Sequence, residues 1–420
     1  MRYNVMKLVA ILYLFSSGPI YAQILLPPIH GPIVDKISIF IPDLNSIGAP
    51  DPRAKEFVEV VRNDLLNTGL FDVKGGTLIT SGDIINFQPL FEAGAEAFIK
   101  GDYFSSGDRI KFDLALYDVA GEDRLLARSY EASSGRVREA AHRFSDSVMK
   151  ELTGLDGFFT SRIAFVSGAR NNRNLYLMDY DGEVIKRLTN HGSLMMSPSC
   201  SPDGSKIIFN SDKIWDQDLY LVTLTPSVSE QRLTRAFKLE QSPEWSPNGR
   251  RIAYSANGEI LVSNPDGSGA VNISRSPRSI DVSPTWSPNG RQIAFVSDRS
   301  GTPEIYVMSS SGGNLRKVSS GGYSTDPSWS PAQEVNRIAF VKLEGGEANI
   351  FTVNSDGSDE QRLTWSSRRN ENPAWSPDGH YIAFTSNRAG QSDLYLMYLN
   401  GQNQRPLTKG GNILFPTWCK

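Results

Sequence analysis

Short apolar runs recur at regular intervals along the second half of the chain. One kind contains Ile-Ala-Phe or a close variant, as in RIAFV at Arg162, RIAYS at Arg251 and HYIAF at His380. A second kind follows it after a polar stretch, as in LYLM at Leu175 and again at Leu394. Runs of this length, rich in β-branched and aromatic residues and bounded by Gly, Asp, Asn and Ser, predict strands rather than helices.

These runs belong to a repeat whose most regular marker is a tryptophan. The phrase SPEWSPNGRRIAY from Ser242 returns as SPTWSPNGRQIAF from Ser283 and as NPAWSPDGHYIAF from Asn372. The markers lie 41 to 46 residues apart; they are Cys200, Trp245, Trp286, Trp329, Trp375 and Trp418. A phrase used so often indicates architecture rather than a catalytic motif. Four strands in a unit of this length are typical of a β-propeller blade.

The ends of the repeat predict the number of blades. The Ile-Ala-Phe run at Arg162 has no tryptophan phrase before it, and the last phrase, FPTW at Phe415, has no such run after it. A ring uses both fragments if Phe415–Trp418 pairs with Arg162–Ser167, which also hides both open sheet edges. We therefore predict a six-bladed, all-β propeller over residues 162–420, closed by the C-terminal strand, with the tryptophans between neighbouring blades.

Residues 23–150 lack the repeat. DKISIFIP from Asp35, EAFIKGDYF and DRIKFDLALYDV predict strands. Asp51-Pro52 begins an amphipathic helix, AKEFVEVVRNDLLNTG, and VREAAHRFSDSVMKELTG predicts a second. Helices over one sheet give an α+β N-terminal domain. We expect this domain over residues 23–150 and a linker over residues 151–161.

The first 22 residues have the pattern of an export signal. A basic start precedes an eight-residue apolar run, Leu8–Phe15, and Ala22 ends a stretch of small and polar residues. This pattern suits signal-peptidase cleavage, and the run is far shorter than the roughly 20 residues that span a bilayer. An uncleaved anchor or a buried helix is the alternative. We expect a cleaved signal peptide over residues 1–22 and an exported protein.

The net charge argues against one class of partner, and the two cysteines leave open whether a disulfide forms. A net charge of −3 argues against a nucleic-acid partner. Cys200 and Cys419 are too few for a disulfide framework. A bond between them needs a Cα separation of about 4.4–6.8 Å, and innermost strands of neighbouring blades can lie further apart than that.

Familiar catalytic patterns are missing from the sequence. It contains no G-x-S-x-G pentapeptide, which the peptidases that carry similar propellers require. Its four histidines, His30, His142, His191 and His380, are scattered, and no H-E-x-x-H occurs. We therefore expect no enzyme, no catalytic residue, no cofactor and no metal site. A cation held by oxygen ligands in the propeller channel stays open. The competing interpretation is an enzyme, or a sugar- or small-molecule-binding propeller, that uses this channel.

Several segments resemble the TolB family, the periplasmic component of the Tol–Pal envelope system. They are NDLLNTGLFDV, AHRFSDSVMKELTG leading into SRIAFVS, LMMSPSCSPDG and FPTW. The resemblance covers nearly all of the chain after the signal peptide. It implies a periplasmic scaffold that supports outer-membrane integrity and constriction at cell division. It also implies binding to the lipoprotein Pal and to TolA, and recruitment by some colicins. We expect a monomer that does not insert into a membrane.

The resemblance also implies where these partners bind. Strand parity puts the residues before each repeat proline at one mouth of the channel, and the family's Pal contacts fall on the loops there. The implied Pal site comprises Met196, Ser197, Leu239, Gln241, Ser242, Val282, Ser283, Asp326, Asn372 and Phe415. The implied TolA site is Ile24, Leu25 and Leu26, in an apolar, Pro-rich segment that can add as a strand to a partner's sheet. That segment can alternatively pack on its own domain.

Overall fold

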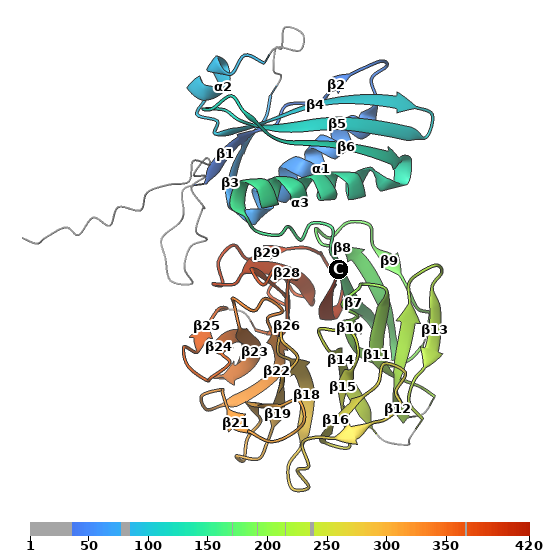
Figure 1. Ribbon diagram of the computed structural model, residues 1–420. Coiled ribbons are helices and arrows are strands. Elements are labelled where there is room, and N and C mark those ends of the chain that lie inside the picture. Colours follow the sequence, from blue (N-terminus) through green and yellow to red (C-terminus); the bar gives the residue numbers. More distant parts are fainter. Residues whose placement is uncertain are drawn as a thin grey trace, which may run out of the picture.

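The computed structural model describes residues 36–76, 85–169, 171–190, 192–214, 216–235, 239–365 and 368–420. The expected signal peptide and the expected TolA site at Ile24–Leu26 lie outside these residues. Within them the chain forms an N-terminal α+β region and a six-bladed β-propeller (Figure 1), which confirms the predicted fold class.

The N-terminal region is one sheet with two long helices on one face. Its strands are β1 (Ile37–Phe40), β2 (Asn45–Ser46), β3 (Phe71–Lys74), β4 (Ala97–Ser106), β5 (Arg109–Asp118) and β6 (Arg124–Ser133). The helices are α1 (Pro52–Thr68), α2 (Gln88–Glu92) and α3 (Val137–Thr153), with a 3-10 turn at Ser134–Arg136. The sheet order is β3-β1-β4-β5-β6, and β2 pairs with β4. Helices α1 and α3 lie between this sheet and the propeller (Figure 1).

Helix α1 begins and ends where its sequence predicts. The Asp51 side chain accepts the backbone N–H of Arg53 at 3.0 Å, and Pro52 occupies the first turn, where its missing N–H costs nothing. Gly69 ends the helix in the left-handed conformation, with φ 71°. Phe57, on the buried face of α1, stacks on Phe112 of β5 with ring centroids 4.2 Å apart.

Each propeller blade is a four-stranded antiparallel sheet whose strands follow one another outward from the channel. The first three blades are β10 (Met195–Cys200), β11 (Lys206–Ile214), β12 (Asp216–Thr223), β13 (Ser229–Arg232); β14 (Glu240–Trp245), β15 (Ile252–Ala256), β16 (Glu259–Ser263), β17 (Val271–Asn272); β18 (Asp281–Trp286), β19 (Gln292–Ser297), β20 (Glu304–Ser309), β21 (Arg316–Lys317). The others are β22 (Tyr323–Trp329), β23 (Arg337–Glu344), β24 (Glu347–Asn354), β25 (Gln361–Arg362); β26 (Asn370–Trp375), β27 (Tyr381–Ser386), β28 (Asp393–Tyr398), β29 (Arg405–Pro406); and β30 (Ile413–Cys419), β7 (Arg162–Ala169), β8 (Asn172–Asp179), β9 (Lys186–Arg187).

The last blade closes the ring as predicted. Strand β30 pairs antiparallel with β7, so that Ile413 lies opposite Ser167 and Trp418 opposite Ile163. The pair left open by the sequence, Cys200 and Cys419, forms a disulfide, with Cα atoms 5.2 Å apart. The separation suits a bond because β10 and β30 are neighbouring innermost strands on the channel, where the blades are closest together.

The marker tryptophans lie between blades, which confirms the structural interpretation of the repeat. Trp286, for example, is buried with residues of its own blade and of the preceding one. Three indole N–H groups donate to a backbone carbonyl of the preceding blade's innermost strand: Trp286 to Glu244 (3.3 Å), Trp375 to Ser328 (3.0 Å) and Trp418 to Ala374 (3.1 Å). Each such tryptophan therefore joins two blades by burial and by one hydrogen bond.

The two parts of the chain share one hydrophobic cluster. Phe158 and Phe159, in the segment after α3, are buried against Tyr180 and Tyr381 of the propeller. The Tyr381 hydroxyl donates to the Thr68 carbonyl at the end of α1, at 3.2 Å. This contact holds α1 and α3 against the propeller face that carries the Asp-Gly and Asn-Gly turns.

Candidate functional site

The principal cavity is the propeller channel. It has a volume of about 630 Å³ and is lined by residues from all six innermost strands, β10, β14, β18, β22, β26 and β30. A second hollow of about 380 Å³ adjoins it and shares Met196, Asp326, Asn372 and Phe415 with the channel lining. The second hollow adds Arg173, Glu371 and two leucines to this end of the channel.

Each innermost strand carries the same irregularity at the repeat proline. The residue before the proline has a positive φ of 48–52°, and the pairing with the next strand shifts register there. These six residues are Ser197, Ser242, Ser283, Asp326, Asn372 and Phe415. Proline cannot donate a ladder hydrogen bond, so each bulge accommodates it and turns the preceding residue out of the regular alternation. Such a conformation is costly for a residue with a side chain, and it recurs six times around one cavity.

The structure brings together eight of the ten residues that the sequence assigned to the mouth. Met196, Gln241 and the six residues of positive φ line the channel cavity. Val282 does not line it: it occupies the position equivalent to Met196 and Gln241, but packs against the apolar cluster between two blades. Leu239, just before β14, also lies off the cavity lining and is 51% exposed.

A carboxylate that the sequence analysis missed also lines the channel. Glu244 Oε1 accepts hydrogen bonds from Thr285 Oγ1 at 3.0 Å and from the Trp286 backbone N–H at 2.9 Å. Burial raises the pKa of Glu244 to about 7 against these two hydrogen bonds, which lower it. The equivalent residues in the other blades are Ser199, Thr285, Ser328, Ala374 and Thr417. The sequence does distinguish Glu244, because it is the one acidic residue among the small residues at the six equivalent positions.

Asp326 is the second channel carboxylate with a shifted pKa. Burial, and then the nearby charge of Glu371, raises its pKa to about 6, and a hydrogen bond from Asn372 Nδ2 at 3.2 Å opposes the shift. Both carboxyls thus gain or lose a proton close to neutral pH. Hydroxyl, amide and carboxyl groups together make the channel a polar, hydrogen-bonding surface with few charges at mildly acidic pH.

The channel residues do not form a compact set of metal ligands. Among the described residues, the one group of three or more His, Cys, Asp or Glu side chains close enough to share an ion is Asp64, His142 and Asp181, outside the channel. Of the helices in the described part of the chain, none is both long and apolar enough to cross a bilayer.

Comparison with known proteins gives consistent matches along the chain. A model of the TolB β-propeller domain matches residues 149–420, and a model of the TolB amino-terminal domain matches residues 28–125. A "Protein TolB homolog" from Chlorobium luteolum is 35% identical over 383 residues, covering 88% of this chain and 87% of that protein. A "Tol-Pal system protein TolB" from Syntrophotalea carbinolica is 36% identical over 220 residues, covering 50% of each.

A solved structure agrees in fold. The crystal structure of TolB from Acinetobacter baumannii has a TM-score of 0.78 and covers 92% of this chain and 97% of that one. At 23% identity this likeness shows the shared architecture alone.

Proposed function

Because the chain belongs to the TolB family, we propose that it is a non-enzymatic periplasmic scaffold of the Tol–Pal system. In this proposal it binds the lipoprotein Pal at the channel mouth and TolA through the segment that follows the signal peptide. By joining these partners it supports outer-membrane integrity and constriction at cell division. The proposal keeps the division into a signal peptide (1–22), an N-terminal domain (23–150), a linker (151–161) and a propeller (162–420).

The observation that carries the proposal is the ring of six bulged positions around the channel. The repeat proline accounts for the break in each ladder, and the left-handed residue before it adds its side chain to the cavity lining in all six innermost strands. Strained backbone that recurs around one cavity supports a binding role for that cavity. Since each bulge fixes its side chain in advance, a partner would lose little freedom of these groups on binding.

The chemistry of the mouth suits a protein segment. Serine, asparagine and glutamine side chains offer donors and acceptors, and Met196 and Phe415 add half-buried apolar surface. The adjoining 380 Å³ hollow widens the surface on one side. Apolar anchors inside a polar rim are common at protein–protein interfaces, where a few residues dominate the binding energy.

Capture of Pal by the purified protein tests the mouth. We expect Met196→Asp to weaken the affinity for Pal at least about tenfold, because it buries an unpaired charge at the interface. Leu315→Asp is the matched control, since Leu315 is 44% exposed and lies just before β21, away from the channel. Equal affinity of Met196→Asp and Leu315→Asp for Pal would place the Pal site elsewhere.

The TolA site is tested separately. Removing residues 23–34 from the exported protein should abolish binding to TolA and leave the affinity for Pal unchanged to within about twofold. Replacing only Ile24, Leu25 and Leu26 by serine should have the same effect if their apolar side chains make the contact. Retained TolA binding in both variants contradicts this assignment without affecting the Pal site.

A further inference from the structure

A buried polar cluster joins the N-terminal domain to the propeller, away from the channel. His142 of α3 shares the proton on its Nδ1 with both carboxylate oxygens of Asp64 of α1, at 3.1 and 2.9 Å. The hydroxyl of Tyr180, just after β8 of the propeller, donates to Asp64 Oδ1 at 2.6 Å. Asp64, His142 and Tyr180 are all at most 3% exposed. A carboxylate at this depth needs partners, and here one comes from each side of the interface.

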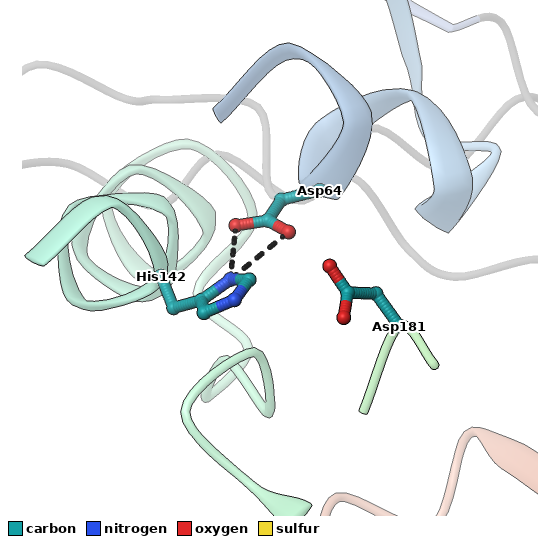
Figure 2. A group of neighbouring side chains, drawn as sticks. All are labelled: Asp64, His142 and Asp181. Atoms are coloured by element: carbon teal, nitrogen blue, oxygen red, sulfur yellow. Dashed lines mark hydrogen bonds and ion pairs between the residues drawn. The ribbon is translucent and has the colours of Figure 1, made fainter. Parts of the chain in front are cut away.

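The propeller contributes charges of its own. Figure 2 shows Asp181 facing Asp64 and His142, and a ring nitrogen of His142 and carboxylate oxygens of both aspartates lie within 4.8 Å of one another. Arg138 of α3 donates to Asp181 Oδ2, and its Nε lies 3.9 Å from Asp179 Oδ2. The Arg138 guanidinium therefore contacts two propeller carboxylates. Among the described residues it makes no hydrogen bond or ion pair with Asp64.

The net charge of this cluster depends on whether His142 is protonated. Burial by itself lowers the His142 pKa, but the hydrogen bond to Asp64 and the charges of Asp64 and Asp181 together raise it above its ordinary value. Other groups facing the cluster are Asp146 on α3, whose pKa is raised by burial, and Arg405 of β29, whose charge acts on Tyr180. His142 Nε2 is buried and has no hydrogen-bond partner among the described residues.

We propose that Asp64, His142 and Asp181 form a proton-operated latch between the N-terminal domain and the propeller. With the ring protonated, one imidazolium lies within 4.8 Å of a carboxylate oxygen of each domain and attracts both. When the Nε2 proton leaves to solvent, Asp64 keeps the Nδ1–H bond, but two carboxylates from opposite domains then face each other without that cation. Their repulsion acts directly across the interface, because both belong to elements packed at the contact.

The direction of the pH effect follows from the raised pKa. The latch is fully closed below the ordinary histidine pKa, about 6.5, and it opens as the pH rises through the higher value in the folded protein. The Tyr180–Asp64 hydrogen bond and the Arg138–Asp181 ion pair do not use the His142 proton and remain above that point, so the interface loosens but does not separate. The inference depends on the geometry of the interface and not on the proposed partners.

A bound metal ion is a weaker account of the same cluster. Arg138 already occupies Asp181, and Asp64 already takes the Nδ1 proton of His142. An ion at this place would have to displace a guanidinium and a proton.

Two measurements on the full-length exported protein test the latch. Histidine-selective NMR, with the signal assigned through His142→Gln, gives the pKa of the ring. Spin labels at Ser129→Cys on β6 and Ser311→Cys in the β20–β21 turn, both exposed, report the distance between the domains. The labels attach cleanly because Cys200 and Cys419, the two cysteines of the chain, are bonded to each other.

We expect a narrow distance distribution at pH 6 that broadens by pH 9, with a midpoint equal to the His142 pKa. In His142→Gln the distance distribution should be broad at both pH values. Asp64→Asn added to His142→Gln should restore a narrow, pH-independent distribution, because it removes the unpaired carboxylate. His380→Gln, on the same propeller face, is the control and should behave as the unaltered protein.

Three results overturn the proposal. One is a distribution that stays constant while His142 titrates. Another is a distance distribution of the double variant that is as broad as that of His142→Gln, which would indicate that His142 has a packing role only. The third is Zn²⁺ that narrows the distribution at pH 9 in the unaltered protein but not in His142→Gln, which assigns the cluster to a metal instead.

Discussion

Blades of the propeller and domains of the chain are held together by different means. Between blades one contact recurs at three junctions: a tryptophan donates its indole N–H to a carbonyl of the preceding innermost strand, as Trp286 does to Glu244 and Trp375 to Ser328. Between the domains nothing repeats, and the polar contacts run through single, buried groups such as Tyr180 and Asp64. A repeated contact between uncharged groups tolerates changes of pH, whereas a unique charged contact responds to them. The ring should therefore act as a rigid platform, and the domain interface as the adjustable part.

The strongest test of the ring is removal of its closing segment. Deleting residues 415–420 removes most of β30, Trp418 and the disulfide partner Cys419, and so exposes the edge of β7. We expect the free energy of unfolding to fall by more than about 5 kcal/mol and the melting temperature by at least about 10 °C. Calorimetry measures both. Deletion of the exposed Lys420 alone is the control, and equal melting of the two variants would contradict ring closure by β30.

The disulfide separates covalent from non-covalent closure. Cys200→Ala keeps the β30–β7 ladder but releases the cross-link, which spans 219 residues. Loop-closure entropy sets an upper value of about 5 kcal/mol for a loop of this length, and we expect a loss of about 3 to 5 kcal/mol. Denaturant unfolding with and without dithiothreitol checks it: the reductant should destabilise the unaltered protein and leave Cys200→Ala unchanged. Sensitivity to reductant in the variant would point to another cause.

These contacts differ in how far the sequence predicts them. The sequence predicts the blade number, the closing strand and the place of the marker tryptophans, because the repeat is periodic and has an incomplete copy at each end. The disulfide does not follow, because the distance between two neighbouring innermost strands depends on how closely the blades approach at the channel. Its place before Ser283 predicts Val282 at the mouth, but an apolar β-branched side chain gains more from packing against the cluster between blades.

The domain interface has no signal in the sequence at all. Asp64 and His142 are 78 residues apart, and each looks like an ordinary polar residue of a helix. Only the packing of α1 and α3 on the propeller brings them to Asp181. Glu244 is intermediate between these two cases. The sequence shows one acidic residue among Ser, Thr and Ala at the equivalent positions, but it does not predict the burial or the hydrogen bonds of this residue.

Glu244 provides a test of pH response inside the ring itself. Its pKa is about 7 in the folded protein and 4.5 ordinarily, so the unfolded state loses this proton first and stability falls as the pH rises from about 4.5 to 7. Glu244→Gln should therefore stabilise the propeller by roughly 1 to 2 kcal/mol at pH 8, allowing for solvent in the channel. At pH 4.5 the difference should vanish. Unfolding curves at both pH values measure it, and an equal difference at each would mean that the charge is not responsible.

The smallest expected effect concerns a neutral contact between the domains. Tyr381→Phe removes the hydroxyl that donates to the Thr68 carbonyl at 3.2 Å and leaves the ring packed against Phe158. The loss should be about 0.5 to 1.5 kcal/mol, since one neutral hydrogen bond is removed. Because neither group carries a charge, the loss should be the same at pH 6 and pH 9, in contrast to that of His142→Gln. Thermal unfolding of both variants at the two pH values checks this. A Tyr381→Phe effect that grows with pH would mean that the whole interface, and not the charged cluster alone, responds to protons.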